Sequence, residues 1–208
     1  SLLLKIFFLF FFIFKNSFSF EVNEVAEGLF VHFGKQEDSN TKNNGDIANI
    51  GFIIGSKSIA VIDTGGTPEI GMSLFKKIRE ISSLPISHII ITHSHPDHFF
   101  GTEALINDKV IIIGHEKLER ALITNFEFYK NLQFSLIKQE SIKKTKLFLP
   151  NQIVKIDSIK TINIGDRKIE IKAWKSGHTD NDLSIYDKKT RFFWSENIFI
   201  ERIPSIRA

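Results

Sequence analysis

Short apolar runs alternate with polar turns along most of the chain, which is the pattern of β-strands joined by loops. Runs rich in Ile, Val and Phe, bounded by Gly, Asn, Asp and Ser, predict strands in the first half of the chain. These strands span residues 28–34, 49–55, 58–64, 87–93 and 109–115. Two later hairpins are predicted at residues 159–174 and 182–199, with turns around Gly165–Asp166 and residues 188–190.

Residues 67–82 instead have the spacing of an amphipathic helix. Thr67 is a suitable N-cap, and Pro68 follows at the first helical position. The predicted apolar face consists of Ile70, Leu74, Ile78 and Ile81. A second helical region is expected at about residues 116–136.

Some of the predicted strands are apolar throughout instead of alternating, namely residues 58–63, 87–92 and 109–113. Strands of this kind are buried on both faces, as in parallel sheets that are covered by helices. With 208 residues, the chain is long enough to bury one sizeable core. The pattern therefore predicts an α/β fold in which a sheet packs beneath helices.

The N-terminal segment has a different character from the rest. An apolar run at residues 6–14 lies between Lys5 and Lys15, and Ser17–Ser19 then resembles a small-residue cleavage site. Residues 1–19 are therefore interpreted as a signal peptide that is removed on export. A membrane anchor is the alternative, but the run is shorter than the roughly 20 apolar residues that a membrane span needs.

The expected mature domain, residues 20–208, would lie in the periplasm or outside the cell. It would be anchored to a membrane only if the N-terminal segment is not cleaved. The chain has 27 basic and 24 acidic residues, and removal of Lys5 and Lys15 leaves 25 basic ones. This near-balance gives no reason to expect a nucleic-acid partner. Because the chain has no cysteine, any metal must be bound by imidazole and carboxylate groups.

Four polar side chains follow a predicted strand directly in the sequence THSHPDHFFG. His93 and His95 are two residues apart, so on an extended backbone they project to the same side. Pro96 favours that extended conformation at His95, and Asp97 and His98 follow at a turn. Imidazole and carboxylate both bind zinc, so the spacing can supply two ligands to one ion and two to a neighbour. A His-rich surface turn is the alternative, but the preceding buried strand disfavours it.

Two other segments extend this constellation. His178, in SGHTDND, can supply a third imidazole to the first ion and leave a coordination position open, as in catalytic zinc sites. Asp63 ends an apolar run just before a Gly pair, where its carboxylate would either orient a ligand histidine or shape the turn, without binding metal. Of the other histidines, His32 and His88 are expected to be ordinary strand residues and His115 a capping or pocket-edge residue.

The segment THSHPDH resembles the H-x-H-x-D-H motif of the metallo-β-lactamase superfamily. VIDTGGT around Asp63 and GHT at residues 177–179 lie where that superfamily has them, and the resemblance covers roughly residues 22–208. It implies an αββα sandwich with a metal site at one edge. The ligands that it implies are His93, His95 and His178 for one zinc ion, and Asp97 and His98 for a second.

The chain departs from the family pattern at two points. The family has an Asp that bridges the two metals at the end of a strand, whereas the stretch FFWSENIF has Glu196 at that position. Glu196 could bridge, bind one metal or be a surface residue. The family's last ligand is a His beyond the bridging position, and no His follows His178 here. We therefore expect a fragment that lacks the C-terminal part of the αββα fold.

These features predict an exported metal-dependent hydrolase that uses one or two zinc ions, with iron or manganese as alternatives. Asp97 would bind the second ion and orient the attacking hydroxide. The substrate would be a small ester, lactone, thioester or lactam. Phrases such as AEGLFVHFG, IANIGFIIG, AVIDTGGTPEIG and ERIPSI resemble exported zinc hydrolases associated with quinoprotein systems. The alternative function is a periplasmic metal-binding accessory protein of such a redox system, with little or no hydrolysis.

Overall fold

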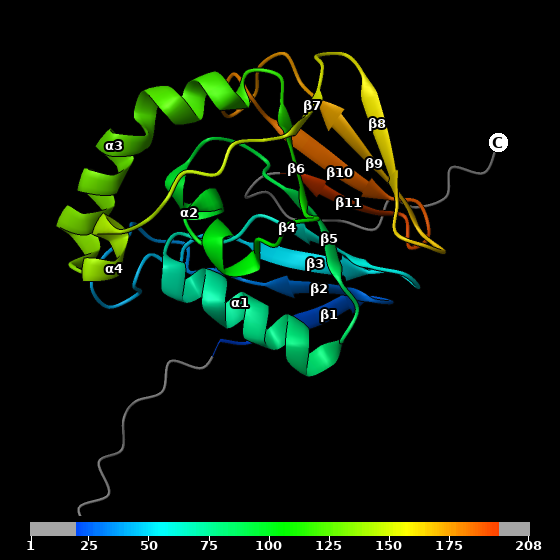
Figure 1. Cartoon of the computed structure of the whole chain (residues 1–208), viewed down its shortest axis with the longest axis horizontal. Helices are drawn as coiled ribbons and strands as arrows, with labels where there is room; N and C mark the ends of the chain where they lie inside the picture. Colours follow the sequence, from blue (N-terminus) through cyan, green and yellow to red (C-terminus); the bar gives the residue numbers. More distant parts are fainter. Residues whose placement is uncertain (1–19, 196–208) are drawn as a thin grey trace, which may run out of the picture.

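The computed structural model describes residues 20–195, which form two β-sheets packed face to face (Figure 1). The larger sheet has the strand order β1-β2-β3-β4-β5-β6-β7. Its strands are β1 (Asn23–Ala26), β2 (Leu29–His32), β3 (Ile50–Ile54), β4 (Ile59–Ile62), β5 (Ile86–Ile90), β6 (Ile111–His115) and β7 (Gln152–Val154). Neighbouring strands are antiparallel from β1 to β4 and parallel from β4 to β7.

The smaller sheet is antiparallel throughout and has the order β11-β10-β9-β8. Its strands are β8 (Ile159–Asn163), β9 (Lys168–Ala173), β10 (Leu183–Asp187) and β11 (Phe192–Ser195). The helical segments are α1 (Pro68–Ile81), α2 (Pro96–Phe99), the short 3-10 helix η1 (Thr102–Leu105), α3 (Leu118–Ile137) and α4 (Glu140–Lys143). All of these helices contribute buried residues to one core on the outer face of the larger sheet.

Two cores arise because successive side chains of a strand point to opposite faces. In β4, Ile59 and Val61 join the core beneath the helices, whereas Ala60 and Ile62 join the core between the sheets. All four side chains are buried, so the prediction of a strand covered on both faces is confirmed. The described residues thus supply one helical layer and two sheet layers of the expected sandwich, and the α/β fold is confirmed.

Helix α1 begins as its sequence predicts. The hydroxyl oxygen of Thr67 accepts a hydrogen bond from the backbone N–H of Ile70 at 3.3 Å, and Pro68 is the first helical residue. The core positions of the helix are Ile70, Leu74 and Ile78. Ile81 was expected to join them, but it is the last helical residue and its side chain is 41% exposed.

Two strands were not anticipated from the sequence. The residues of β1 are mostly exposed and polar, and β7 has only three residues, so neither has a distinct apolar pattern. The second helical region, predicted at about residues 116–136, is observed as α3. The segment before β7 is partly buried, and its residues Leu147, Phe148 and Leu149 pack against the helical core.

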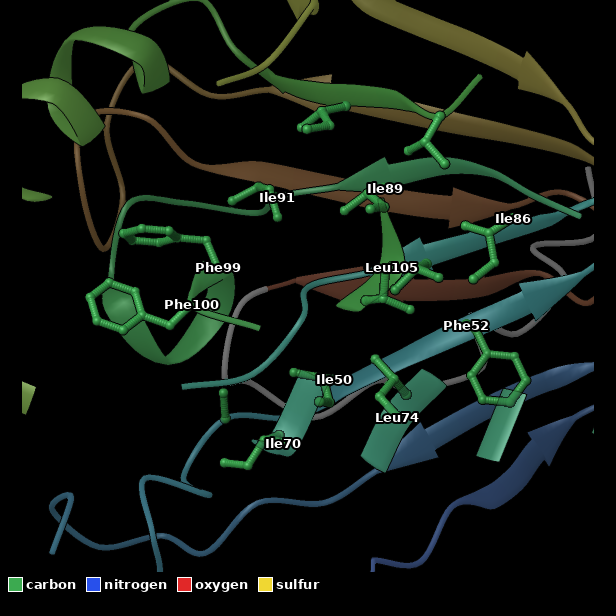
Figure 2. Close-up of a cluster of buried hydrophobic side chains, with 14 of the residues drawn as sticks. Ile50, Phe52, Ile70, Leu74, Ile86, Ile89, Ile91, Phe99, Phe100 and Leu105 are labelled. Atoms are coloured by element: carbon green, nitrogen blue, oxygen red, sulfur yellow. The ribbon is translucent and has the colours of Figure 1, made fainter. Parts of the chain in front are cut away.

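The short helix α2 is held by the aromatic pair that follows its histidines. Phe99 and Phe100 are almost fully buried and lie in the same cluster as Ile70 and Leu74 of α1 (Figure 2). Burial of one such side chain contributes roughly 1.5–3 kcal/mol. A turn of four residues cannot persist alone, so these aromatic anchors fix its position against α1 and the sheet.

Helix α1 also approaches the chain beyond α2 at a pair of glycines. A Cβ atom at Gly71 would lie 2.2 Å from the carbonyl oxygen of Gly101, and one at Gly101 would lie 2.0 Å from that of Thr64. The backbone N–H of Gly101 donates to the carbonyl of Gly65 at 3.0 Å. Because neither glycine has a side chain, α1, the loop after β4 and the end of α2 can lie in close contact.

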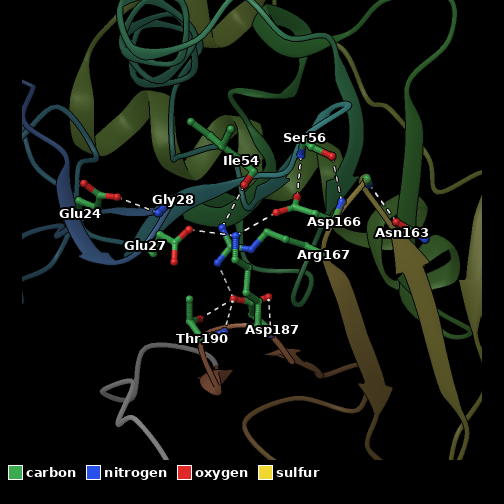
Figure 3. A network of polar contacts seen from close by, with 12 residues as sticks. Glu24, Glu27, Gly28, Ile54, Ser56, Asn163, Asp166, Arg167, Asp187 and Thr190 are labelled. Carbon is green, nitrogen blue, oxygen red and sulfur yellow. Dashed lines mark hydrogen bonds and ion pairs between the residues drawn. The ribbon is translucent and has the colours of Figure 1, made fainter.

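A buried ion pair joins the two sheets at the end of β3 and the end of β10. Arg167 donates through Nη2 to the carboxylate of Asp187 at 2.7 Å and through Nη1 to the carbonyl of Ile54 at 3.0 Å (Figure 3). Both charged side chains are nearly inaccessible to solvent. Thr190 adds a backbone N–H that donates to Asp187 at 3.2 Å. This network lies at the edge of the sandwich opposite to the histidines, because β3 ends where β4 begins.

Candidate metal centre

The predicted ligands meet at the carboxyl ends of the parallel strands. Asp63 directly follows β4, and His93 lies three residues beyond the end of β5, the neighbouring parallel strand. Carboxyl ends of parallel strands open at one edge of a sheet, where loops can gather polar groups. Thr64 donates its backbone N–H to the carbonyl of His98 at 2.8 Å, which fixes the two loops to each other.

Asp63 organises this edge through one buried carboxylate. Its Oδ1 accepts the backbone N–H of Thr92 at 2.8 Å, and its Oδ2 accepts the Thr92 hydroxyl and Nδ1 of His98, both at 2.8 Å. Asp63 has φ of 56°, an unusual conformation for a residue with a side chain. It therefore has both roles that the sequence left open, because it shapes the turn and also supports a candidate ligand.

These hydrogen bonds assign the tautomers of two histidines. Because the Thr92 hydroxyl donates its only proton to Asp63, its oxygen accepts from Nδ1 of His93 at 3.0 Å. His98 likewise donates its Nδ1 proton to Asp63. Nε2 of His93, which is neutral because burial lowers its pKa, then carries a lone pair, the form that binds a metal ion, whereas Nε2 of His98 has a free lone pair only when that ring is neutral.

The structure brings His93, His95 and His178 together although 83 residues separate the last two. One nitrogen from each ring lies within 4.8 Å of the other two. Nδ1 of His95 is 3.2 Å from Nε2 of His93 and 3.0 Å from Nε2 of His178. Zinc–nitrogen bonds of about 2.0–2.1 Å in a tetrahedron separate neighbouring nitrogens by about 3.3 Å. The donor set therefore fits one such ion.

Asp97 and His98 lie beside this triad as a second pair. Nε2 of His98 is 3.2 Å from Oδ2 of Asp97, but no atom of the described residues makes a hydrogen bond with that buried nitrogen. The ring centroids of His93 and His98 are 4.1 Å apart. A buried imidazole nitrogen without a hydrogen bond, aimed at a carboxylate, is consistent with the second predicted metal position.

Burial and charge have opposite effects on these groups. Burial lowers the pKa of His93, and the neighbouring histidines lower it further, so His93 is neutral and able to bind metal. Burial alone would also lower the pKa of His98, but the carboxylates of Asp97 and Asp63 raise it well above its usual value. The two carboxylates thus favour positive charge at His98, whether from a proton or from a metal ion.

The loop that carries His178 is tied to the loop that carries His93. The side-chain amide of Asn181 donates to the hydroxyl of Ser94 at 3.2 Å, and the backbone N–H of Leu183 donates to the carbonyl of Thr92 at 2.8 Å. Within the loop, the Asp182 carboxylate accepts the backbone N–H of Thr179 at 2.9 Å. These supporting residues were missed from the sequence, although Asn181 and Asp182 follow His178 closely.

The remaining histidines are outside the cluster. His115 accepts the backbone N–H of Lys117 through Nδ1 at 3.0 Å, but Lys117 is itself the N-cap residue of α3 and no side chain caps that helix, so the expected capping role is not observed. His88 contacts the neighbouring Ser87 hydroxyl. His32 was expected to be an ordinary strand residue, but it is buried and 2.7 Å from Asp46. Glu196, the candidate bridging residue, lies outside the described residues, as does the predicted signal segment at residues 1–19.

A pocket opens beside Asp97. Its volume is about 510 Å³, and the rest of its lining comes from the loop between β2 and β3, with Lys35, Glu37 and Asn49 among the lining residues. Within the described part of the chain, no helix is long and apolar enough to cross a membrane.

Comparison with known proteins gives a family for this arrangement. The family model described as the metallo-beta-lactamase superfamily matches residues 43–193, which include His93, His95, Asp97, His98 and His178. The match therefore contains every candidate ligand except Glu196.

Curated relatives match shorter stretches. The linear primary-alkylsulfatase of a Pseudomonas species is 29% identical over 62 residues, which is 30% of this chain and 12% of that protein. An alkyl/aryl-sulfatase of Saccharomyces cerevisiae is 31% identical over 74 residues, which is 35% of this chain and 12% of that protein. The chain thus matches about one eighth of the length of these relatives.

Solved structures show the same fold. The sec-alkylsulfatase Pisa1 from a Pseudomonas species aligns with a TM-score of 0.60 at 21% identity over 81% of this chain and 30% of that one. A metallo-beta-lactamase from Hirschia baltica aligns with a TM-score of 0.59 at 15% identity over 83% of this chain and 68% of that one.

Proposed function

The chain belongs to the metallo-beta-lactamase superfamily, and on that premise we propose that it is a zinc-dependent hydrolase of small substrates. The observation that carries the proposal is the convergence of His93, His95 and His178, whose donor atoms lie within 4.8 Å of one another. Three imidazoles around one open position are the ligand set of a catalytic zinc ion.

The residues around the cluster have distinct roles in this proposal. A bound zinc ion lowers the pKa of its water ligand and so supplies hydroxide at neutral pH. His93 presents a neutral imidazole nitrogen because burial lowers its pKa, and Asp63 fixes the orientation of His93 through Thr92. Asp97 is partly accessible, with 13% of its side chain exposed, and lies at the wall of the pocket. It can accept a hydrogen bond from the attacking water and orient it toward a substrate held there.

The names of the relatives extend the range of candidate substrates. Three of the four are alkyl- or alkyl/aryl-sulfatases and the fourth is a metallo-beta-lactamase, so sulfate esters join lactams, lactones, thioesters and carboxylic esters as candidates. All these compounds have an electrophilic centre that bears oxygen and is attacked by hydroxide. The proposal is thus a reaction class rather than one substrate.

The experiment measures metal content and hydrolysis together. The purified chain is loaded with zinc and assayed with 4-nitrophenyl sulfate, 4-nitrophenyl acetate, a chromogenic cephalosporin, a lactone and a thioester. We expect stoichiometric zinc, turnover of at least one compound, and loss of both in His95→Ala. His88→Gln is the matched control, because His88 lies on β5 outside the cluster. Unchanged zinc content or unchanged turnover in His95→Ala would contradict the proposal.

The same experiment separates a second function. Stoichiometric zinc without turnover of any compound would favour the metal-binding accessory protein of a quinoprotein redox system. Glu196 motivates this alternative, because it stands where the family has the Asp that bridges two metal ions. We also propose export of the mature domain, which cell fractionation of the full-length protein would test.

A further inference from the structure

Tyr129 lies beside the histidine cluster but comes from a different part of the fold. It is on α3, and its ring meets the ring of His95 edge-on, with centroids 6.4 Å apart and an interplanar angle of 90°. The side chain is only partly buried. No sequence motif connects Tyr129 with the cluster, because the residue belongs to the long helix α3.

Contacts on both sides of Tyr129 hold this part of α3 in place. One turn earlier, Phe126 is buried against Phe100, with ring centroids 5.8 Å apart. One turn later, the buried side chain of Gln133 donates to the carbonyl of Gly66 at 3.5 Å. A Cβ atom at Gly66 would lie only 3.2 Å from the Cα atom of Asp97. The helix is therefore fixed to the same loops that carry the candidate ligands.

The phenol group of Tyr129 has no partner within residues 20–195, since neither a hydrogen bond nor an ion pair involves it. It nevertheless lies close enough to Asp97 for the carboxylate to act on it electrostatically: burial raises the pKa of Tyr129, and the charge of Asp97 raises it further. A phenol with an ordinary pKa near 10 is already a neutral donor at pH 7. The hydroxyl is thus available to a ligand at the cluster.

Packing alone does not account for a tyrosine at this position. Tyr129 lies at the margin of the helical core, next to Phe128, whose side chain is 63% exposed. A phenylalanine would supply the same ring contacts with His95 and Phe128. What tyrosine adds is one O–H donor beside the candidate metal centre.

We propose that the Tyr129 hydroxyl donates a hydrogen bond to the substrate, at an oxygen that gains negative charge when hydroxide attacks. The inference rests on the proposed hydrolase function and assigns a further catalytic residue to that site. It also narrows the substrate to compounds with an oxyanion-forming group, such as a sulfate ester or an acyl compound. Tyr129 keeps its proton throughout and acts only as a donor.

The kinetic test is Tyr129→Phe, which removes one oxygen atom and keeps the ring. With the best compound of the hydrolysis panel, kcat should fall about 10- to 100-fold while KM and zinc content change little. Tyr186→Phe is the matched control, since Tyr186 is the other of the two tyrosines and lies on β10, in a pocket on the smaller sheet. An equal fall in both variants, or none in Tyr129→Phe, overturns the proposal.

A binding test does not depend on hydrolysis. The chain is labelled with 3-fluorotyrosine, which gives two ¹⁹F resonances that Tyr186→Phe assigns. Inorganic phosphate serves as the oxyanion probe for the zinc-loaded protein. We expect phosphate to shift the Tyr129 resonance and leave that of Tyr186 unchanged. In calorimetric titration, Tyr129→Phe should weaken phosphate binding about 5- to 10-fold.

The two tests distinguish failure of this inference from failure of the proposed function. A Tyr129 resonance that responds to phosphate in a protein without turnover supports Tyr129 as a donor to an oxyanion at the cluster and contradicts the hydrolase function. If the protein hydrolyses a compound but saturating phosphate does not shift the Tyr129 resonance, the role given to Tyr129 is wrong and the hydrolase function stands. An absence of phosphate binding overturns the role of Tyr129 as well, because a donor beside a bound cation must favour an oxyanion there.

Discussion

Oδ2 of Asp63 and Nδ1 of His98 lie 2.8 Å apart in a pair whose two side chains are each only 1% exposed. The same carboxylate supports His93 through Thr92, so one side chain after β4 positions two candidate ligands after β5. This relationship explains how short loops can hold an imidazole cluster rigidly before any ion binds.

Asp63→Asn should lower both stability and zinc affinity. The amide keeps the size and tolerates the φ of 56°, but it cannot accept all three hydrogen bonds that the carboxylate receives. We expect a loss of about 1–3 kcal/mol in the free energy of unfolding and a 10- to 100-fold weaker zinc affinity. Denaturant titration and competition with a chelator measure the two quantities. Asp157→Asn is the control, because Asp157 is exposed and has a similar φ of 60°.

Asn181→Ala should affect metal affinity more than stability. Asn181 ties the His178 loop to Ser94, and its removal frees the third imidazole to leave the cluster. We expect a zinc affinity about 10-fold lower, with little change in the melting temperature of the zinc-free protein. Asn125→Ala provides the comparison, since the Asn125 side chain bonds only within α3. Equal zinc affinity in the two variants would contradict the role given to this loop.

Gly71→Ala, a substitution in α1, should displace the neighbouring helix α2. The new methyl group would lie 2.2 Å from the carbonyl oxygen of Gly101, so α1 and the loop after α2 must separate. Overpacking of this kind costs about 1–3 kcal/mol of unfolding free energy. Thermal unfolding measures the loss, and Met72→Ala on the exposed side of α1 should change the melting temperature much less. If Gly71→Ala has the melting temperature of the wild type, α1 and Gly101 are not in close contact.

Arg167→Met should destabilise the sandwich without changing the metal centre. The substitution leaves Asp187 as a buried carboxylate without its charge partner, at a cost of about 3–5 kcal/mol. Lys188→Met, which breaks the exposed pair with Glu170, should cost about 0–1 kcal/mol. Adding Asp187→Asn to Arg167→Met should restore part of the lost stability, because it removes the unpaired charge. If the double variant is no more stable than Arg167→Met, the unpaired charge of Asp187 is not the cause of the lost stability.

The sequence was sufficient for the features that depend on local patterns. The buried strand β4 and the start of α1 at Thr67 follow from periodicity and capping, and the cluster of His93 and His95 follows from spacing within one segment. His178 could be assigned because a family motif supplies the long-range pairing that periodicity cannot. The sequence pattern could not predict roles that depend on contacts between residues far apart in the chain.

Tyr129 and Arg167 illustrate that limit. Tyr129 lies within α3 and Arg167 in the turn before β9, and the role of each depends on a partner that is distant in sequence, His95 and Asp187 respectively. The positive φ of Asp63 is likewise set by the backbone bonds of the loop rather than by residue type. Tertiary packing therefore determines which polar residues support the centre, and the sequence pattern alone does not contain that information.

The most direct test of the account is zinc K-edge X-ray absorption of the chain loaded with one equivalent of zinc. The account predicts a shell of light atoms at about 2.0–2.1 Å with the outer-shell scattering of three imidazole rings. In His178→Ala, one imidazole should disappear from that signal. A zinc spectrum without imidazole scattering, or one that is identical in wild type and His178→Ala, would contradict the claim that His93, His95 and His178 hold one metal ion together.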